Sequence, residues 1–248
     1  MPHCRTPSRR SFAAFLASRR APLIYVNMPK SACTSLKNIL YWLDNEAFLK
    51  DPLTIHRRTD LLLRGATSPI VLANRLSSDI VFTFVRHPLR RAFSCFNEKI
   101  FSHGPYSFPR VRQCLCEAYQ ADFLSYPDLD NYRSNFKAFL RFSHDSFRGK
   151  NGWRRDPHWC PQTMVLANVE KIRRVDFIGR VESFNAHLSA LLSISQLRLP
   201  ATLPPMNEGA KPPFRFEDVV DDEIERIAMS FLNFDMYYFG YRDILSDR

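Results

Sequence analysis

A lysine, several small residues and three hydroxyl side chains follow a short apolar run near the start of the chain. The stretch from Leu23 to Leu43 reads LIYVNMPKSACTSLKNILYWL, whose first residues predict a buried strand and whose last residues predict a helix. A strand–loop–helix passage points unpaired amides and the positive end of a helix dipole at one place, where Lys30 adds a full charge. These residues predict an anion site, to which Thr34 and Ser35 can donate hydroxyl groups.

A second run, FVRHPLRRAFSCFNEK from Phe84 to Lys99, also places basic and hydroxyl side chains directly after a predicted strand. Arg86 stands at the end of a predicted strand, and Ser94 lies two turns into the helix that follows. An arginine fork and a serine hydroxyl can converge on one phosphate. Two phosphate sites, one at each strand end, favour a nucleotide that is phosphorylated at both ends of its ribose.

Together the two runs resemble motifs of the sulfotransferases that use 3′-phosphoadenosine 5′-phosphosulfate (PAPS), specifically the carbohydrate branch related to chondroitin, HNK-1 and heparan 2-O-sulfotransferases. PKSACTSLK resembles the loop that binds the 5′-phosphosulfate, and VRHPLRRAFSCFNEK resembles the 3′-phosphate motif, with Phe96 replacing a tyrosine. DPHWCPQ, VDFIGRVESF and the ending FDMYYFGY also look familial. The similarity runs from about residue 22 to residue 242.

The resemblance implies an α/β, P-loop-like three-layer fold with a central, mainly parallel sheet flanked by helices. It also implies PAPS as donor, 3′-phosphoadenosine 5′-phosphate (PAP) as product, no metal, and a hydroxyl acceptor on a carbohydrate or glycolipid. Lys30 would contact the bridging oxygen of the donor. The implied donor-binding residues are Pro29, Lys30, Ser31, Ala32, Cys33, Thr34, Ser35, Leu36, Arg86 and Ser94.

The acceptor hydroxyl must lose its proton, and a histidine suits that task near neutral pH. Two of the seven histidines are candidates for a catalytic role, in addition to Lys30. His56, in TIHRR, lies between the two phosphate motifs, where relatives such as heparan 2-O-sulfotransferase carry their catalytic histidine. His158, in DPHWCPQ, has tryptophan and proline neighbours that suit stacking on a sugar ring. We expect His56 to be the base and His158 to act mainly on acceptor affinity, with the reverse assignment kept open.

Three apolar runs predict the strands that position these residues. They are LIYV, DIVFTFV (residues 79–85) and VDFIGRV (residues 175–181), and helical patterns follow them, including residues 89–100. Strands that alternate with helices predict a mainly parallel sheet. Residues 221–233 predict a further helix, residues 200–216 a proline-rich loop or lid, and FDMYYFGY an aromatic cluster in the core.

The start of the chain is rich in arginine, with five in the first 21 residues around SFAAFLA. We expect residues 1–21 to be a basic tail and residues 22–248 to form a single sulfotransferase domain. A basic amphipathic start could instead touch a membrane surface. No apolar run is long enough to span a bilayer, and no signal peptide is evident, so we expect a cytoplasmic protein with free cysteines.

A net charge of +10 attracts anions of several kinds, so two other hypotheses were compared with sulfuryl transfer. A P-loop kinase or other phosphotransferase requires G-x-x-x-x-G-K-[ST], and the loop after the first strand contains no glycine. A basic nucleic-acid-binding module fits the charge, but no recognised motif is present, so we expect no nucleic-acid partner. Cys114 and Cys116 with His158 and Cys160 fit no strong zinc pattern, so no metal site is expected.

Overall fold

The computed structural model describes residues 14–58, 60–65, 68–123, 128–200 and 211–241. The chain divides into two compact units. Unit 1 comprises residues 1–85 and 165–207, and unit 2 comprises residues 86–164 and 208–248. The single domain expected over residues 22–248 stays a prediction.

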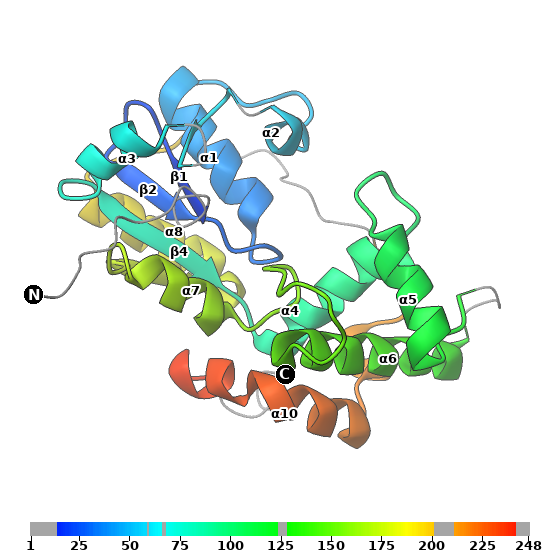
Figure 1. Cartoon of the computed structure of the whole chain (residues 1–248). Helices are drawn as coiled ribbons and strands as arrows, with labels where there is room; N and C mark the ends of the chain where they lie inside the picture. Colours follow the sequence, from blue (N-terminus) through cyan, green and yellow to red (C-terminus); the bar gives the residue numbers. More distant parts are fainter. Residues whose placement is uncertain (1–13, 59, 66–67, 124–127, 201–210, 242–248) are drawn as a thin grey trace, which may run out of the picture. The chain divides into compact units, whose positions relative to one another are not determined.

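Unit 1 contains a mixed five-stranded sheet with the strand order β3-β1-β2-β4-β5. Strands β2, β4 and β5 are parallel to one another, whereas β1 pairs antiparallel with both β2 and β3. Figure 1 labels β1, β2 and β4 in blue and cyan. The strands are β1 (Phe15–Ala17), β2 (Leu23–Val26), β3 (Leu63–Arg64), β4 (Ile80–Val85) and β5 (Phe177–Arg180).

The three strands predicted from apolar runs are confirmed, and they are the parallel ones. All residues of β2, and all residues of β4 after Ile80, are buried, as expected for strands covered on both faces. Gly179 of β5 lies against the Phe84 ring, where a Cβ would come within 2.6 Å of ring atoms. The result is an α/β sheet flanked by helices. Its P-loop-like character stays a prediction.

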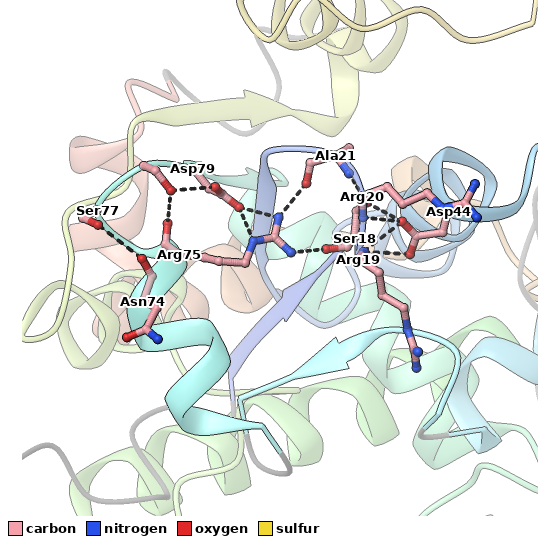
Figure 2. Close-up of polar contacts among 10 residues, drawn as sticks. Ser18, Arg19, Arg20, Ala21, Asp44, Asn74, Arg75, Ser77 and Asp79 are labelled. Atoms are coloured by element: carbon pink, nitrogen blue, oxygen red, sulfur yellow. Dashed lines mark hydrogen bonds and ion pairs between the residues drawn. The ribbon is translucent and has the colours of Figure 1, made fainter.

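Residues 14–21 differ from the basic tail expected over residues 1–21, of which residues 1–13 lie outside the described residues. Phe15–Ala17 forms buried strand β1, because its apolar side chains complete the sheet beside β2. Asp44 then fixes the turn after β1 by accepting hydrogen bonds from Ser18 Oγ (2.5 Å) and from the Arg19 and Arg20 amides (2.8 and 3.0 Å; Figure 2).

Arg75 binds the other side of the same turn. It donates to the Ala21 carbonyl (2.6 Å) and to the Ser18 carbonyl, and it forms an ion pair with Asp79 (Figure 2). The turn is therefore held by a carboxylate on one side and a guanidinium on the other. The arginine-rich start of the chain reads as a tail in the sequence, although two of its arginines, Arg19 and Arg20, stand in this ordered turn.

Three helices of unit 1 pack on one face of the sheet. Leu36 and Leu40 from the first helix, Ile55 from the second and Leu188 from a later helix join Tyr25 and Phe84 in one buried cluster. The helical elements with residues in unit 1 are α1 (Cys33–Asn45), α2 (Thr54–Arg57), α3 (Pro69–Arg75), η3 (Val181–Ser183), α8 (Phe184–Ile194) and α7 (Gln162–Glu170), which crosses the unit boundary.

The carboxyl ends of β2 and β4 lie at the same edge of the sheet, because these strands are parallel with Tyr25 opposite Phe82. Residues 27–32 leave β2 at this edge and lead directly into α1. Ligands of parallel α/β sheets bind outside the carboxyl ends of the strands. The loop that contains Lys30 therefore lies at the edge of the sheet where ligands of such folds usually bind.

Unit 2 is helical around an aromatic core. Phe96 is completely buried and its ring lies 5.2 to 5.9 Å from those of Tyr132, Phe136 and Phe139. Its elements are α4 (Pro88–Cys95), the π-helix η2 (Phe96–Phe101), α5 (Pro109–Tyr119), α6 (Leu129–Arg148), α9 (Phe216–Val219) and α10 (Asp222–Tyr238). The helices expected over residues 89–100 and 221–233 are thereby confirmed, the first changing to a π-helix at Phe96.

The core role expected for FDMYYFGY is only partly correct. Met236, Phe239 and Tyr241 are buried, whereas Tyr237 is 84% exposed, Phe234 58% and Tyr238 48%. Most of this segment is the end of α10, and successive residues of a helix point to different sides, so a continuous aromatic run cannot face the core as a whole.

None of the helices within the described ranges is long and apolar enough to cross a membrane. The cytoplasmic location stays a prediction. The proline-rich loop or lid expected over residues 200–216 falls largely on residues 201–210, which lie outside the described residues.

Candidate active site

The loop between β2 and α1 takes an unusual backbone conformation. Lys30 and Ala32 have φ values of 68° and 57°, in the left-handed region that residues with a Cβ seldom adopt. Such a conformation costs of order 1–3 kcal/mol per residue and concentrates at ligand sites. The Ser31 amide, between Lys30 and Ala32, donates to the Met28 carbonyl (3.3 Å), so the amides left for a ligand are those that follow it.

The first turn of α1 continues this array of donors. The amides of Cys33, Thr34 and Ser35 precede the first intrahelical hydrogen bonds, so α1 presents them at its positive end. Leu36 differs from the other residues of the implied donor-binding set. Its amide donates to the Ala32 carbonyl at 3.0 Å and its side chain is buried in the core, so we do not expect it to contact a ligand.

His56, from the short helix α2, lies directly against the first turns of α1. Its Nε2 is 2.9 Å from Thr34 Oγ1, and its Nδ1 is 3.3 Å from Lys37 Nζ. Asn38 of α1 ties its own helix to the turn before α2 by donating to the Thr34 carbonyl (2.9 Å) and the Pro52 carbonyl (3.0 Å). The structure thus brings together a predicted base and a predicted donor-binding hydroxyl.

Lys37 is the unexpected member of this cluster. The side chain is 5% exposed, and burial lowers its pKa from the ordinary lysine value; Cys33 opposes the shift and Arg64 adds to it. A lysine two positions beyond the hydroxyl pair reads in the sequence as either solvated or phosphate-binding. Its burial beside His56 follows from the helical spacing, because Thr34 and Lys37 are three residues apart on the same face of α1.

The Lys37 contact determines which nitrogen of His56 carries the proton. An ammonium can only donate, so it requires an unprotonated Nδ1 and puts the ring proton on Nε2. A neutral Lys37 amine can accept from Nδ1–H, which leaves Nε2 free to accept a proton. Because burial lowers the pKa of Lys37, the second arrangement is reached at lower pH than for a solvated lysine.

The second phosphate motif opens unit 2, with Arg86 directly after β4 and Ser94 in the second turn of α4. Gln162 fixes the Arg86 backbone from both sides. Its Oε1 accepts from the Arg86 amide (3.0 Å) and its Nε2 donates to the Arg86 carbonyl (2.8 Å). Gln162 comes from DPHWCPQ, so this familial stretch positions the arginine of the second motif.

The familial stretch FDMYYFGY contributes Asp235, which lies in α10 and contacts Gln162 and its neighbour Thr163. The Asp235 side chain is completely buried. Its carboxylate accepts from the Gln162 amide (2.6 Å), the Thr163 amide (2.9 Å) and Thr163 Oγ1 (2.6 Å). Asp235 thus caps the first turn of α7. The sequence gives only an indirect signal for Gln162 and Asp235, namely polar residues within otherwise apolar familial stretches.

His158 stands in a tight turn within unit 2. Asp156 Oδ1 accepts from the His158 amide (2.8 Å) and lies 2.7 Å from His158 Nδ1, and the imidazole packs edge to face on Phe108 with ring centres 5.2 Å apart. Burial alone would raise the pKa of Asp156, but hydrogen bonds from His158 and the nearby Arg91 guanidinium outweigh it and lower that pKa.

Buried Arg91 supports the backbone of the same turn. It donates to the Cys160 carbonyl (2.9 Å) and to the Pro157 carbonyl on the two sides of His158. Phe96, which replaces the tyrosine of the family motif, has a different role, because it packs in the aromatic core of unit 2.

The predicted site residues thus form two groups. Lys30, Thr34, Ser35 and His56 belong to unit 1, and Arg86, Ser94 and His158 belong to unit 2. Across the described part of the chain, no cluster of three or more histidine, cysteine or acidic residues could hold a metal ion, and the cysteines there are free thiols.

Comparison with known proteins gives a coherent result. The model of the sulfotransferase family matches residues 13–242. Human carbohydrate sulfotransferase 14 is 27% identical over 178 residues, which cover 71% of this chain and 45% of that protein. Human carbohydrate sulfotransferase 8 is 23% identical over 202 residues, covering 80% of this chain and 46% of that protein.

The chain spans less than half the length of these relatives. No solved structure matches the chain significantly. The family match nevertheless extends from β1 to the end of α10 and includes every motif described above. This chain belongs to the sulfotransferase family.

Proposed function

We propose that this chain transfers a sulfuryl group from PAPS to a hydroxyl group of a carbohydrate. The observation that carries the proposal is the contact of His56 with Thr34 at the first turn of α1, directly after the loop that contains Lys30. A proton acceptor and an anion site that adjoin each other are what sulfuryl transfer to a hydroxyl requires. Membership of the sulfotransferase family supports the same reaction.

In this proposal the donor's 5′ end binds to Lys30, the amides of residues 32–35 and the hydroxyls of Thr34 and Ser35. Arg86 and Ser94 bind the 3′-phosphate, in a P-loop-like arrangement of the two strand ends. The left-handed conformations of Lys30 and Ala32 support a ligand-binding role for the loop, because backbone strain of this kind concentrates at functional sites. The Gln162 contacts support a fixed position for the Arg86 backbone.

The acceptor hydroxyl attacks sulfur, and His56 accepts the proton that the hydroxyl loses. A new oxygen–sulfur bond forms as the bond between sulfur and the bridging phosphate oxygen breaks, and PAP leaves with the electron pair. Lys30 neutralises the charge that develops on the leaving oxygen. A preorganised donor of this kind lowers the barrier by about 2.7 to 4 kcal/mol.

Thermal unfolding in the presence of nucleotides tests the donor. PAP should raise the Tm, because a ligand that binds only the folded state stabilises it. Adenosine 5′-phosphosulfate, which lacks the 3′-phosphate, should raise it far less. Equal stabilisation by both would remove the role given to Arg86 and Ser94.

ATP with magnesium serves as the control ligand in the same experiment. The proposal expects little stabilisation by it, because the loop lacks the glycines of a nucleotide P-loop. Stabilisation by ATP and magnesium without a response to PAP would favour a phosphotransferase and would contradict the proposal.

A further inference from the structure

Unit 2 contains a pocket that none of the donor-binding residues lines. It is formed by two segments, residues 108–111 at the start of α5 and residues from 151 to 159 after α6, and has a volume of about 820 Å³. This size lies within the range of small-molecule sites in proteins. All of its lining residues belong to unit 2.

The apolar part of the lining is aromatic. Phe108, Trp153 and Trp159 all contribute, and Phe108 and Trp153 are only partly buried, so ring surface remains accessible. Trp159 is held by a hydrogen bond from its Nε1 to Ser146 Oγ (3.1 Å) and by packing on Phe142. Flat, fixed rings of this kind offer large contact area at low entropic cost.

The turn that carries Trp153 is also fixed. Asn151 Oδ1 accepts from the Trp153 amide (3.1 Å), and Asn151 Nδ2 donates to the Phe142 carbonyl (3.1 Å) and Tyr119 Oη (3.2 Å). Gly152 has a φ of 72°, which glycine adopts without strain. The aromatic wall is therefore preorganised for a ligand.

The polar part of the lining is basic. Arg110 and Arg154 line the pocket, and neither guanidinium forms an ion pair with any acidic residue among those described. Asp156, the acidic member of the lining, is engaged by His158. Two exposed guanidinium groups beside aromatic rings match a ligand that presents an anionic group next to a flat apolar face.

We propose that this pocket binds an acidic saccharide, whose ring packs on Trp153 and Phe108 and whose carboxylate or sulfate ester binds Arg110 and Arg154. This binding is a property of unit 2 alone and does not depend on the proposed function. His158 adjoins the pocket through Asp156 and Phe108 and acts as a positioning residue for its wall.

Tryptophan fluorescence provides a direct binding assay that needs no donor. Two of the three tryptophans line the pocket, and the third, Trp42, lies in α1. Chemically desulfated chondroitin hexasaccharide presents carboxylates alone, and carboxyl-reduced chondroitin sulfate hexasaccharide presents sulfate esters alone. The hexasaccharide that is both desulfated and carboxyl-reduced presents neither.

We expect at least one acidic hexasaccharide to change the emission saturably, and the neutral one to bind at least about tenfold more weakly. Arg110→Gln and Arg154→Gln should each raise the Kd by roughly tenfold. Arg148→Gln removes the same charge from the exposed end of α6, outside the pocket, and should leave the Kd nearly unchanged. Trp153→Phe should remove most of the signal.

Equal affinity for the neutral and acidic hexasaccharides would overturn the proposal that the pocket selects an acidic ligand. An equal loss of affinity in all three arginine variants would overturn the location, because it would indicate general charge attraction. Absence of saturable binding by any hexasaccharide would overturn the pocket's role, even if PAP still raised the Tm. Saccharide binding without a PAP response would instead leave the pocket in place and contradict the proposed function.

Discussion

The two candidate histidines lie in surroundings of opposite chemistry. His56 contacts the hydroxyl of Thr34 and the amine of Lys37, both on the helix that follows the Lys30 loop. His158 contacts the carboxylate of Asp156 and the ring of Phe108, both of which line the aromatic pocket of unit 2. One imidazole thus adjoins the loop that we propose to bind the donor, and the other adjoins the pocket that we propose to bind an acidic saccharide.

These different surroundings favour different roles for the two histidines, one as the general base and the other as a residue that shapes the pocket. The sequence already favours His56 as the base and His158 as a residue that acts on acceptor affinity, and the contacts of the two side chains are consistent with that division. His56 adjoins the groups that we propose to bind the donor, so it is suited to accept a proton during transfer. Asp156 holds His158 Nδ1 and thereby the orientation of the ring, which suits a residue that shapes the pocket.

The largest effect that would sharpen this comparison is expected from His56→Ala. Loss of a general base should lower kcat by roughly 10²- to 10⁴-fold while PAP binding is retained. His158→Ala should mainly raise KM for the acceptor. Steady-state kinetics at saturating PAPS measures both.

His103→Ala is a matched control, because His103 is exposed and its Nδ1 lies 2.9 Å from Arg112 Nη1, away from both candidate histidines in the sequence. It should leave both constants nearly unchanged. A near wild-type kcat for His56→Ala together with a collapsed kcat for His158→Ala would reverse the assignment.

The next largest effect is expected from Lys30→Ala, which removes the charge proposed to stabilise the leaving oxygen. That charge grows only as the bridging bond breaks, so kcat should fall by roughly 10²- to 10³-fold with a smaller change in KM. Lys50→Ala, at an exposed position, is the control. A change confined to KM would show that Lys30 binds the ground state and the transition state equally.

A smaller effect, visible in the pH dependence, is expected from Lys37→Met. Proton acceptance at His56 Nε2 requires a neutral Lys37, so kcat/KM of the wild type should rise as pH increases through the lowered pKa of Lys37. Lys37→Met should remove this rise in a profile from about pH 6 to about pH 10. Retention of the rise would exclude Lys37 as its cause, and exposed Lys171→Met controls for loss of a lysine.

The same shift predicts the sign of a stability effect. The unfolded chain keeps the Lys37 proton up to the ordinary lysine pKa, whereas the folded chain loses it at lower pH. The unfolded state therefore binds more protons between the two pKa values, and the free energy of unfolding should rise with pH across that window. Lys37→Met should flatten the rise in denaturant titrations, and an unchanged slope would contradict the buried placement of Lys37.

The smallest effect is expected from Gln162→Leu, which removes the contacts that fix the Arg86 backbone. We expect KM for PAPS to rise by about tenfold or less and kcat to change little, because the arginine side chain itself remains. Gln113→Leu, at an exposed position of α5, is the control. A large fall in kcat without a change in KM would place Gln162 in the chemistry instead.

The sequence predicted the elements whose signals are local. The three parallel strands are continuous apolar runs, and the loop with Lys30 passes directly from one of them into a helix. Strand β1 was missed because Phe15–Ala17 is only three residues long and lies among arginines. Its place in the sheet depends on pairing with β2, which no local pattern reveals.

The contacts within the candidate site were less predictable, because they join distant parts of the chain. Thr34 and His56 are 22 residues apart, and Arg86 and Gln162 are 76 apart. The resemblance singled out His56, but it gave no indication that Lys37 is buried beside it. The aromatic pocket likewise depends on how the start of α5 meets the segment after α6, which is a matter of tertiary packing.

Transfer of radiolabelled sulfuryl from PAPS tests the central claim most directly. The intact chain is incubated with labelled PAPS and desulfated chondroitin oligosaccharide, and both the labelled saccharide and the released PAP are measured. The account predicts an alkali-stable sulfate ester on the saccharide, PAP released in equal amount, and loss of both with His56→Ala. A chain that binds PAP but forms no labelled ester on this or any other glycan in a panel would contradict it.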